Sequence, residues 1–352
     1  RIGNVSAIGA LHNHPSNAVR LAAVVALRRM EAPEVALFLA DKEESIIAEA
    51  ARAINDDFSI EEALPALGSV LSSEGLTSEP LLRRAINANL RVGGDDALGL
   101  VLDFIGLESA PEAMRIEAIE ALSNWHNPSL LDRVTGRFRG EVKRDVNKIR
   151  VKASTPLLQL TAHSNPTIRK TAISAIGSLK VAAATEKLIS LLKTDRDPVV
   201  REAAINALAN MGSENLVSAL EVATTDKNKM VRIAGLAILG EMDLPGKTVA
   251  ALLEKVILNQ TVEEKQVAIT ALAKVDSTYA TPVFKRLLKA MKNKDLPATV
   301  ELELSESLET LGDETLLSQY NSIISQMYAG DVMASYNSSL FGGDAIKGRR
   351  IF

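Results

Sequence analysis

The feature that most constrains this chain is a helical pattern that returns at intervals of about 31 residues. Each copy has a capping or turn residue, then an apolar residue directly before an arginine, then Ala, Ile and Leu at helical spacing. The clearest copies are HPSNAVRLAAVVALRRM (14–30), NPTIRKTAISAIGSLK (165–180), DPVVREAAINALANMG (197–212) and NKMVRIAGLAILGEM (228–242). Asn or Asp at a helix start accepts bonds from free backbone N–H groups, and Pro fits the first turn. Apolar residues at i, i+3, i+4 and i+7 form one buried stripe, so each copy is predicted to be an amphipathic helix.

The arginines of the pattern mark a repeat of two helices. Weaker copies occupy residues 44–56, 79–93, 262–275 and 298–312, and second amphipathic segments such as 33–41, 184–195 and 248–258 fill many gaps. The unit is therefore two antiparallel helices, repeated about nine times. The anchor arginines are Arg20, Arg115, Arg169, Arg201 and Arg232, the last three being 32 and 31 residues apart.

A helix pair of this size cannot bury its apolar stripe alone, so neighbouring pairs must stack to share one core. The period and the Asp-Pro-x-Val-Arg signature at 197–201 resemble HEAT repeats. We expect an all-α, HEAT-like (armadillo-type) α-solenoid. The anchor arginines are interpreted as structural, each reaching a carboxylate or a carbonyl at an adjoining turn; a ligand-binding role is the alternative.

The composition disfavours several functions. The chain is 47% hydrophobic but only 3% aromatic, which suits closely packed helices better than an aromatic-lined enzyme pocket. A net charge of -4 gives no global argument for nucleic acid or an anionic membrane, and no apolar run approaches the ~18 residues of a membrane span. The absence of cysteine excludes disulfides and thiolate metal sites from this segment.

One basic stretch interrupts the rhythm between Arg115 and Arg169. We expect an insertion at about 127–154, whose charges either contact a partner or are solvated and offset acidic neighbours; the second interpretation is favoured. Binding of nucleic acid there would have to weaken steeply with salt, and Phe138 is the one aromatic residue among these charges, so no nucleic-acid partner is predicted. The candidate partner contacts are Arg137, Arg139, Lys143, Arg144, Lys148 and Arg150.

The four histidines give no catalytic or metal constellation. His12 and His14 are two residues apart, which places them on different sides of a helix, and a loop position beside Pro15 is expected. His126 follows Trp125 just past a helix end, where both are expected to close a packing layer, and His163 has no identifiable partner. We find no Ser-His-Asp order and no phosphate-binding glycine loop, so no catalytic residue and no metal are predicted.

Four phrases in the first half resemble a more specific family. They are VRLAAVVALRRM (19–30), EAARAINDDFSIEEALPAL (49–67), LLRRAINANLRVG (81–93) and LSNWHNPSLLDRVTGRFR (122–139). In that order they resemble the helical middle region of large exported bacterial proteins called membrane-bound dehydrogenase-like or PVC-type haem-binding proteins. The resemblance covers about residues 1–152; the rest resembles HEAT repeats only generically. In that family a β-propeller resembling quinoprotein dehydrogenases comes first, and a c-type cytochrome domain comes last.

The last residues, GGDAIKGRRIF (342–352), resemble the first helix of a small cytochrome c domain. The resemblance implies that Asp344 caps this helix, that Gly348 lets a second helix cross closely, and that Ile351 and Phe352 face the haem. In the family a Cys-x-x-Cys-His motif follows; without cysteine, this segment holds no haem c itself. Residues 1–327 are thus expected to form the solenoid, 328–343 a linker, and 344–352 the start of a truncated cytochrome domain.

Two functions remain open from the sequence. The first is a non-catalytic spacer that holds a dehydrogenase propeller and a haem domain of one exported, periplasmic polypeptide at a separation suited to electron transfer. Haem c, and pyrroloquinoline quinone (PQQ) if the parent is a sugar or alcohol dehydrogenase, would then belong to the parent protein. The alternative is a stand-alone HEAT-repeat module that binds a protein partner.

Overall fold

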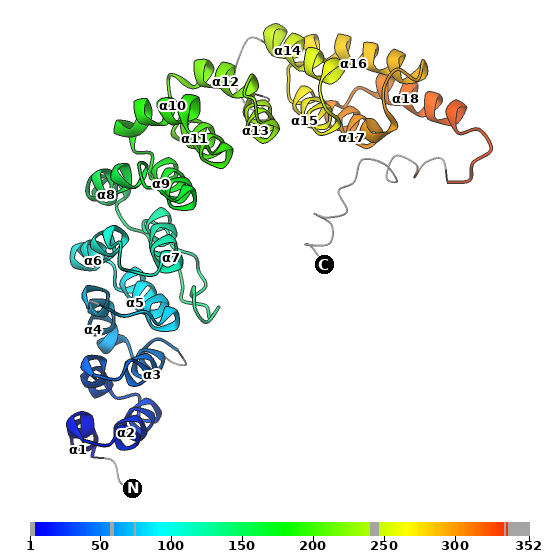
Figure 1. Ribbon diagram of the computed structural model, residues 1–352. Coiled ribbons are helices and arrows are strands. Elements are labelled where there is room, and N and C mark those ends of the chain that lie inside the picture. The colour runs from blue at the N-terminus through cyan, green and yellow to red at the C-terminus, as the bar shows by residue number, and fades with distance from the viewer. Residues whose placement is uncertain (1–3, 57–59, 74, 240–245, 334–335, 337–352) are drawn as a thin grey trace. The chain divides into compact units, whose positions relative to one another are not determined.

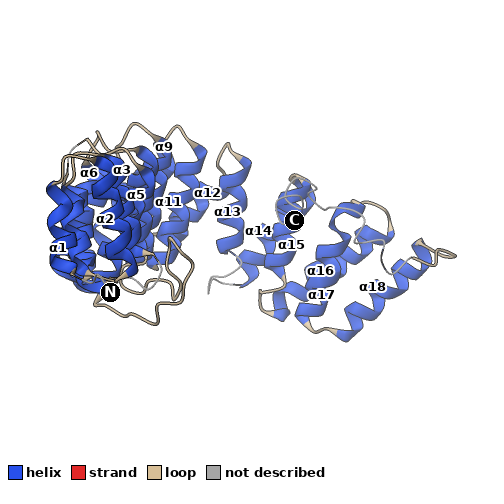
Figure 2. Ribbon diagram, turned by 90° about the horizontal axis from the view of Figure 1, so that it is seen from below, coloured by secondary structure: helices blue, strands red, loops and turns tan. Residues whose placement is uncertain are grey.

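The computed structural model describes residues 4–56, 60–73, 75–239, 246–333 and 336 (Figure 1). In this part of the chain, helices follow one another joined by loops and there is no β-strand (Figure 2). An isolated antiparallel β-bridge joins Leu131 and Phe138. The chain divides into two compact units, residues 1–191 with 210–213, and residues 192–209 with 214–352.

Unit 1 is a stack of helix pairs in two layers (Figure 1). One layer contains α2, α3, α5, α7 and α9, each packed on the next, and in the other layer α4 packs on α6 and α6 on α8. The pairs are α1 (Val5–Gly9) with α2 (Asn17–Arg29), the 3-10 helix η2 (Pro33–Ala40) with α3 (Glu44–Asn55), α4 (Leu64–Ser69) with α5 (Glu79–Val92), α6 (Gly94–Gly106) with α7 (Glu112–Ser123), and α8 (Val146–Leu160) with α9 (Pro166–Leu179). Short 3-10 turns lie at η1 (Ala10–Asn13), η3 (Glu61–Ala63), η4 (Val70–Ser72) and η5 (Ala182–Ala184).

Unit 2 repeats the same arrangement. The boundary between the units falls in the chain within α10 (Thr185–Thr194), and α13 packs on α15 and α15 on α17 as the successive members of one layer. Its helices are α11 (Pro198–Met211), α12 (Leu216–Thr224), α13 (Lys229–Leu239), α14 (Gly246–Asn259), α15 (Val262–Leu272), α16 (Ser277–Lys292), the 3-10 turn η6 (Ala298–Val300), α17 (Glu301–Leu311) and α18 (Glu314–Met327).

The helices begin where the sequence offers capping side chains. The side-chain oxygen of Asn165 accepts a bond from the N–H of Thr167 at the start of α9, and Asp313 accepts from Thr315 and Leu316 at the start of α18. Such a cap stabilises a helix by about 1 kcal/mol because it satisfies a donor that has no partner inside the helix.

Aliphatic side chains fill the interior between the layers. In α9, Ile168, Ile173, Ile176 and Leu179 are fully buried, and Ala172 beside them lets neighbouring helices approach. Burying each large aliphatic side chain contributes about 1.5–3 kcal/mol. The prediction of an all-α, HEAT-like α-solenoid of about nine helix pairs is confirmed: in the described residues the element order gives nine pairs followed by α18.

Two local features differ from the sequence expectation. The segment 33–41 was expected as an ordinary amphipathic helix, whereas Pro33–Ala40 form a 3-10 helix. The irregular segment after α7 ends at Asp145, so residues 146–154 of the expected insertion instead form the first part of α8. Asp344, Gly348, Ile351 and Phe352, on which the cytochrome expectation depends, lie outside the described residues.

Candidate functional site

The anchor arginines bind the turns of the stack. Arg201 in α11 donates to both oxygens of Asp226, at 2.7 Å from Nε and 2.8 Å from Nη2, and Asp226 precedes α13. Its Nη1 donates to the carbonyl oxygens of Asp195 and Arg196, in the turn before its own helix. One side chain, only 2% exposed, therefore joins two turns.

Arg20 and Arg232 use the same geometry. Arg20 binds Asp41 at 2.6 and 3.0 Å, and Arg232 binds Glu264 at 2.6 and 3.2 Å. Both also donate through Nη1 to the carbonyl oxygens five and six residues earlier. Arg169 makes the same pair of carbonyl bonds, to His163 and Ser164.

Arg115 differs from the other anchors. Its Nε donates to the carbonyl oxygen of Ile105 at 2.9 Å, and its Nη1 lies 3.3 Å from Nε2 of His163. His163 occupies the turn position that Asp41 and Asp226 hold elsewhere, and its Nδ1 accepts a bond from the N–H of Asn165. Burial lowers the pKa of Arg115.

The carboxylates at these turns stay ionised. Burial by itself raises the pKa of Asp226, but the hydrogen bonds from Arg201 and from the N–H of Asn228 outweigh it, so the pKa lies below its ordinary value. The pKa of Asp41 is lowered in the same way by Arg20 and the N–H of Glu43, against burial. The contacts of Arg20 and Arg201 are thus buried ion pairs that link successive turns.

The irregular segment between α7 and α8, residues 124–145, contains a tight hairpin. The N–H of Asp132 donates to the carbonyl of Arg137 at 2.7 Å, and the N–H of Arg139 donates to the carbonyl of Leu130 at 2.8 Å. Leu131 and Phe138 form the bridge between these bonds and are 52% and 71% exposed. The hairpin therefore presents apolar side chains to solvent.

A buried polar network holds the hairpin on the stack. The side chain of Asp132 accepts bonds from Val134 and Thr135 in its own turn, from Asn87 in α5 at 3.0 Å, and from Arg139 at 3.1 Å. Asn87 in turn donates to Asn55 in α3. Although burial raises the pKa of Asp132, these hydrogen bonds lower it below its ordinary value. Asp132 is therefore an anion that fixes the segment to two helices.

Arg144 fastens the other end of the segment. Its Nη2 donates to the carbonyl of Leu90 at 2.6 Å and its Nη1 to the carbonyl of Trp125 at 2.7 Å. Its guanidinium carbon lies 5.7 Å from the centre of the Trp125 ring, and it sits against Gly93. Gly93 has φ +67, and a Cβ there would meet this guanidinium, so both the backbone and the contact require glycine.

The six basic side chains considered as candidate partner contacts do not form one cluster. Arg139 and Arg144 bind within unit 1, and Arg150 in α8 donates to the carbonyl of Leu179. Lys143 pairs with Glu141 at the surface at 2.7 Å, and Arg137 and Lys148 are exposed.

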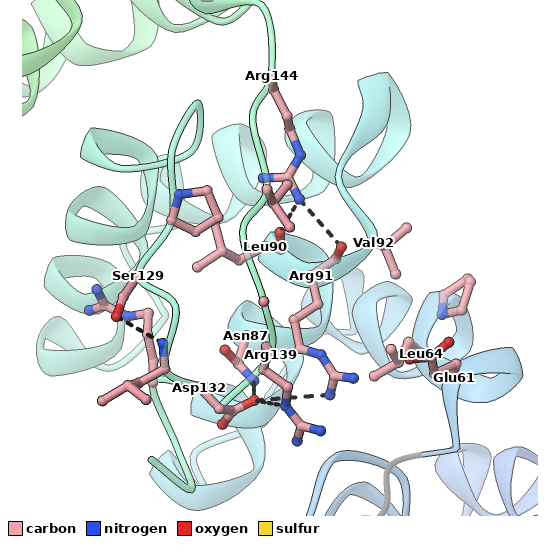
Figure 3. Close-up of a pocket in the computed structure, with 16 residues that line it drawn as sticks. Glu61, Leu64, Asn87, Leu90, Arg91, Val92, Ser129, Asp132, Arg139 and Arg144 are labelled. Atoms are coloured by element: carbon pink, nitrogen blue, oxygen red, sulfur yellow. Dashed lines mark hydrogen bonds and ion pairs between the residues drawn. The ribbon is translucent and has the colours of Figure 1, made fainter. Parts of the chain in front are cut away.

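A pocket of about 420 Å³ lies where the segment meets α4 and α5 (Figure 3). Its apolar wall includes Leu64, Leu90, Val92, Leu131 and Val142. Its charged lining consists of Arg91, Arg133, Arg139 and Arg144 with Glu61 and Asp132. Two of the arginines, Arg139 and Arg144, belong to the candidate partner contacts.

Arg91 and Arg139 share one carboxylate. Nη1 of Arg91 lies 4.0 Å and Nε of Arg139 lies 3.1 Å from the same Oδ2 of Asp132. Figure 3 shows both guanidinium groups turned toward this carboxylate. Burial, and then the charge of Arg139, lower the pKa of Arg91, against the opposing effect of the carboxylates of Asp132 and Glu61.

Sequence reasoning did not identify Arg91, Asp132 or Asn87 as site residues. The available signal was weak: Asn55, Asn87 and Asn89 interrupt apolar helix stripes, and buried amides require partners. The partners of Asn87, Asn55 and Asp132, are 32 and 45 residues away in the chain, and helical periodicity cannot give that pairing.

His14 lies in a loop as expected, whereas His12, also expected in a loop, lies in the 3-10 helix η1. His12 contacts Phe38 edge to face, and Nδ1 of His14 accepts a bond from the N–H of Ser16. Trp125 is 1% exposed beside His126. Across the residues that the structure describes, no group of three or more His, Asp or Glu side chains is placed to hold a metal ion, and no helix is long and apolar enough to cross a membrane.

The fold and these arginine contacts define a protein built of stacked helix pairs. Comparison of its sequence with family models identifies the type of repeat. A family model of HEAT repeats matches residues 104–209, 154–240 and 185–273. HEAT repeats are therefore present in this central part of the chain. No curated protein sequence gives a significant match.

Comparison with solved structures gives matches at low sequence identity. A mutant of Kap121p matches with a TM-score of 0.57 and 13% identity, over 95% of this chain and 41% of that one. YibA of E. coli matches with a TM-score of 0.49 and 16% identity, over 85% and 95% of the two chains. The complex of CpcE and CpcF of phycocyanin lyase from Nostoc sp. PCC7120 matches with a TM-score of 0.39 and 16% identity, over 74% and 94%. At 13% identity the likeness to the Kap121p mutant, whose TM-score is 0.57, is one of fold alone.

Proposed function

We propose that this chain is a non-catalytic HEAT-repeat scaffold that holds other protein domains on its surface. The observation that carries the proposal is the docking of segment 124–145. Arg139, Asp132 and Arg144 tie this segment to α3 and α5, and Arg144 also bonds to the carbonyl of Trp125 within the segment, so that it forms a fixed feature on the helix stack. A long loop without helices is uncommon in a compact domain unless it has a function.

The finer proposal concerns the parent protein. The phrases at 19–30, 49–67, 81–93 and 122–139 and the ending at 342–352 support a place between a dehydrogenase propeller and a c-type cytochrome domain. The scaffold would then keep the two centres at a separation suited to electron transfer, in an exported, periplasmic protein. Haem c, and PQQ if the propeller is a sugar or alcohol dehydrogenase, would be bound by those domains.

The gene tests the finer proposal. We expect a Cys-x-x-Cys-His motif within about thirty codons after Phe352 and a propeller-encoding region before Arg1. A gene that lacks both would exclude the dehydrogenase context and favour the stand-alone interaction module.

A binding experiment tests the scaffold itself. The chain is immobilised and presented with the separately produced propeller and haem domains, or, if the gene lacks them, with lysate of the source cells followed by identification of the bound protein. We expect a partner to bind to the chain. The same partner should bind less well to a variant in which residues 128–142 are replaced by a Gly-Ser linker. Equal binding by both forms would remove the segment from the proposed docking surface.

A further inference from the structure

At two joints of the stack, one carboxylate accepts hydrogen bonds from two sides at once. Asp226 accepts from Arg201 at 2.7 Å and from the N–H of Asn228, in its own turn, also at 2.7 Å. Asp41 has the same arrangement with Arg20 and a backbone N–H of its own turn. A carboxylate suits this place because each of its two oxygens is an acceptor, so both donors are satisfied together.

At the joint between α7 and α9 the same place is held by His163. Its Nδ1 accepts a bond from the N–H of Asn165 at 3.0 Å, and its Nε2 lies 3.3 Å from Nη1 of Arg115. A neutral imidazole has only one ring nitrogen that can accept, because the other carries the proton. One of the two contacts therefore sets a donor against a donor, and this joint cannot reach the full bonding of Asp226.

The charged groups around His163 come from α7, from the turn before α7 and from α9. Arg115 in α7 is 4% exposed, and Arg169 in α9 donates through Nη1 to the carbonyl oxygen of His163 at 2.9 Å. Burial lowers the pKa of Arg115, and the carboxylates of Glu108 and Glu112 oppose this effect. Among the described residues, Arg115 is the charged group in contact with the imidazole ring.

We propose that His163 is a pH-sensitive joint of the stack, at which uptake of a proton releases α7 from the turn before α9. Histidine is the side chain that ordinarily changes its charge between about pH 5 and 8. In the imidazolium both ring nitrogens carry protons, so neither Asn165 nor Arg115 finds an acceptor there, and a ring nitrogen of one cation stands 3.3 Å from another cation. Acid should therefore open this joint. The joints closed by Asp41 and Asp226 keep their bonds, because their carboxylates stay ionised.

Amide hydrogen exchange of the whole chain tests the proposal at about pH 7.5 and about pH 5.5, with rates corrected for the intrinsic effect of pH on exchange. In the wild type we expect protection of residues 161–170 to be about tenfold lower at the acidic pH, because the joint opens locally. Residues 224–233, whose turn is closed by Asp226, should change by less than about twofold. The measurement requires no partner, so its outcome is independent of the scaffold proposal.

Variants of His163 separate the proton from the packing. His163→Asp supplies the carboxylate found at Asp226, so the loss of protection in acid should disappear, and the urea midpoint at about pH 5.5 should rise above that of the wild type. His163→Gln is the second variant, because glutamine keeps an acceptor but takes up no proton. It too should remove the acid effect.

His14 offers a matched control. It lies six residues before Arg20, as His163 lies six residues before Arg169, and its Nδ1 also accepts a backbone N–H, that of Ser16 at 3.1 Å. Among the described residues no arginine side chain bonds to its ring. His14→Gln should therefore leave the acid effect at residues 161–170 unchanged.

Three results would overturn the proposal. The first is equal protection of residues 161–170 at both pH values in the wild type. The second is an acid effect that persists in folded His163→Asp and His163→Gln. The third is a loss of protection in acid that is the same at every turn of unit 1, since that is general acid unfolding rather than the opening of one joint.

Discussion

At the scale of single residues, the anchor arginines combine two tasks in one side chain. In Arg20, Arg201 and Arg232, Nη1 closes the turn before its own helix, and Nε with Nη2 binds a carboxylate just before the next helix of the layer or, for Arg232, in its first turn. A lysine would carry the charge but lacks the planar fork that makes both sets of bonds. Arginine is therefore required by geometry at these positions.

Removal of one such anchor should be costly. We expect Arg201→Met to lower the free energy of unfolding by about 3 kcal/mol, because Asp226 is then left buried without its cation. Lys229→Met removes a comparable ion pair, with Glu263, from an exposed site in the same unit and should cost less than about 1 kcal/mol. Urea unfolding followed by circular dichroism measures both; equal effects would contradict the role of burial.

Glu301 provides a pH-dependent test in α17. Burial raises the pKa of this carboxyl, which is 2% exposed and accepts a hydrogen bond from the hydroxyl of Tyr328 at 3.2 Å. The folded state therefore binds the proton more tightly than the unfolded state. The ionised form is destabilising above the raised pKa, and this effect disappears as the pH falls toward about 4.3, the ordinary pKa of Glu.

Glu301→Gln should accordingly raise the thermal midpoint at pH 8, since glutamine carries no charge but still accepts the tyrosine bond. The gain should shrink steadily as the pH is lowered toward 5. Melting curves of wild type and variant across this range provide the measurement, with Glu309→Gln, an exposed position of the same helix, as the control. A gain that does not change with pH would refute the buried-charge explanation.

At the scale of elements, segment 124–145 is held by few side chains and should open when one is removed. Arg144→Met deletes the bonds to the carbonyls of Leu90 and Trp125. We expect faster amide hydrogen exchange at Asp132 and Arg139, whose N–H groups close the hairpin, while α9 stays protected. Lys143→Met at the neighbouring exposed position should change neither.

Gly93→Ala should produce the same local opening, because a Cβ would push the guanidinium of Arg144 away from α5 and the backbone has φ +67. The double variant Gly93→Ala with Arg144→Met should therefore be less destabilised than the sum of the two single variants. A double-mutant cycle by urea unfolding measures this coupling. Full additivity would show that Gly93 and Arg144 act independently.

The helices were accessible from sequence because their signals are local. Asn165 with Pro166 marks the start of α9. Ile168, Ala172 and Ile176 mark its buried face, and each of these lies four residues, about one helical turn, from the next. The pocket was not accessible, because Asp132, Asn87 and Asn55 meet only after separate pairs have stacked. The basic composition of the insertion was visible, but not that Arg139 and Arg144 point inward to carbonyls and a carboxylate.

At the scale of the whole molecule, the sequence predicts one repeating array, whereas the structure divides it into two compact units with a boundary at Leu191 and Leu192. Nothing in the periodic pattern marks this point, since Leu188, Leu191 and Leu192 are all buried apolar residues of one helix. In repeat proteins each pair is stabilised mainly by its neighbours, so a chain of this kind need not unfold in one step.

The two units should therefore unfold as separate cooperative blocks, and the single tryptophan makes this measurable. Trp125 is buried in unit 1, so its fluorescence reports that unit, whereas circular dichroism reports helices in both. Leu253→Ala in α14 and Leu81→Ala in α5 each remove a fully buried side chain, at a cost of about 2–5 kcal/mol. Leu253→Ala should lower the urea midpoint of part of the dichroism signal and leave the fluorescence midpoint unchanged, while Leu81→Ala should lower the fluorescence midpoint. If both variants move both signals equally, the chain unfolds as one cooperative block, and contacts within each unit do not decide its stability.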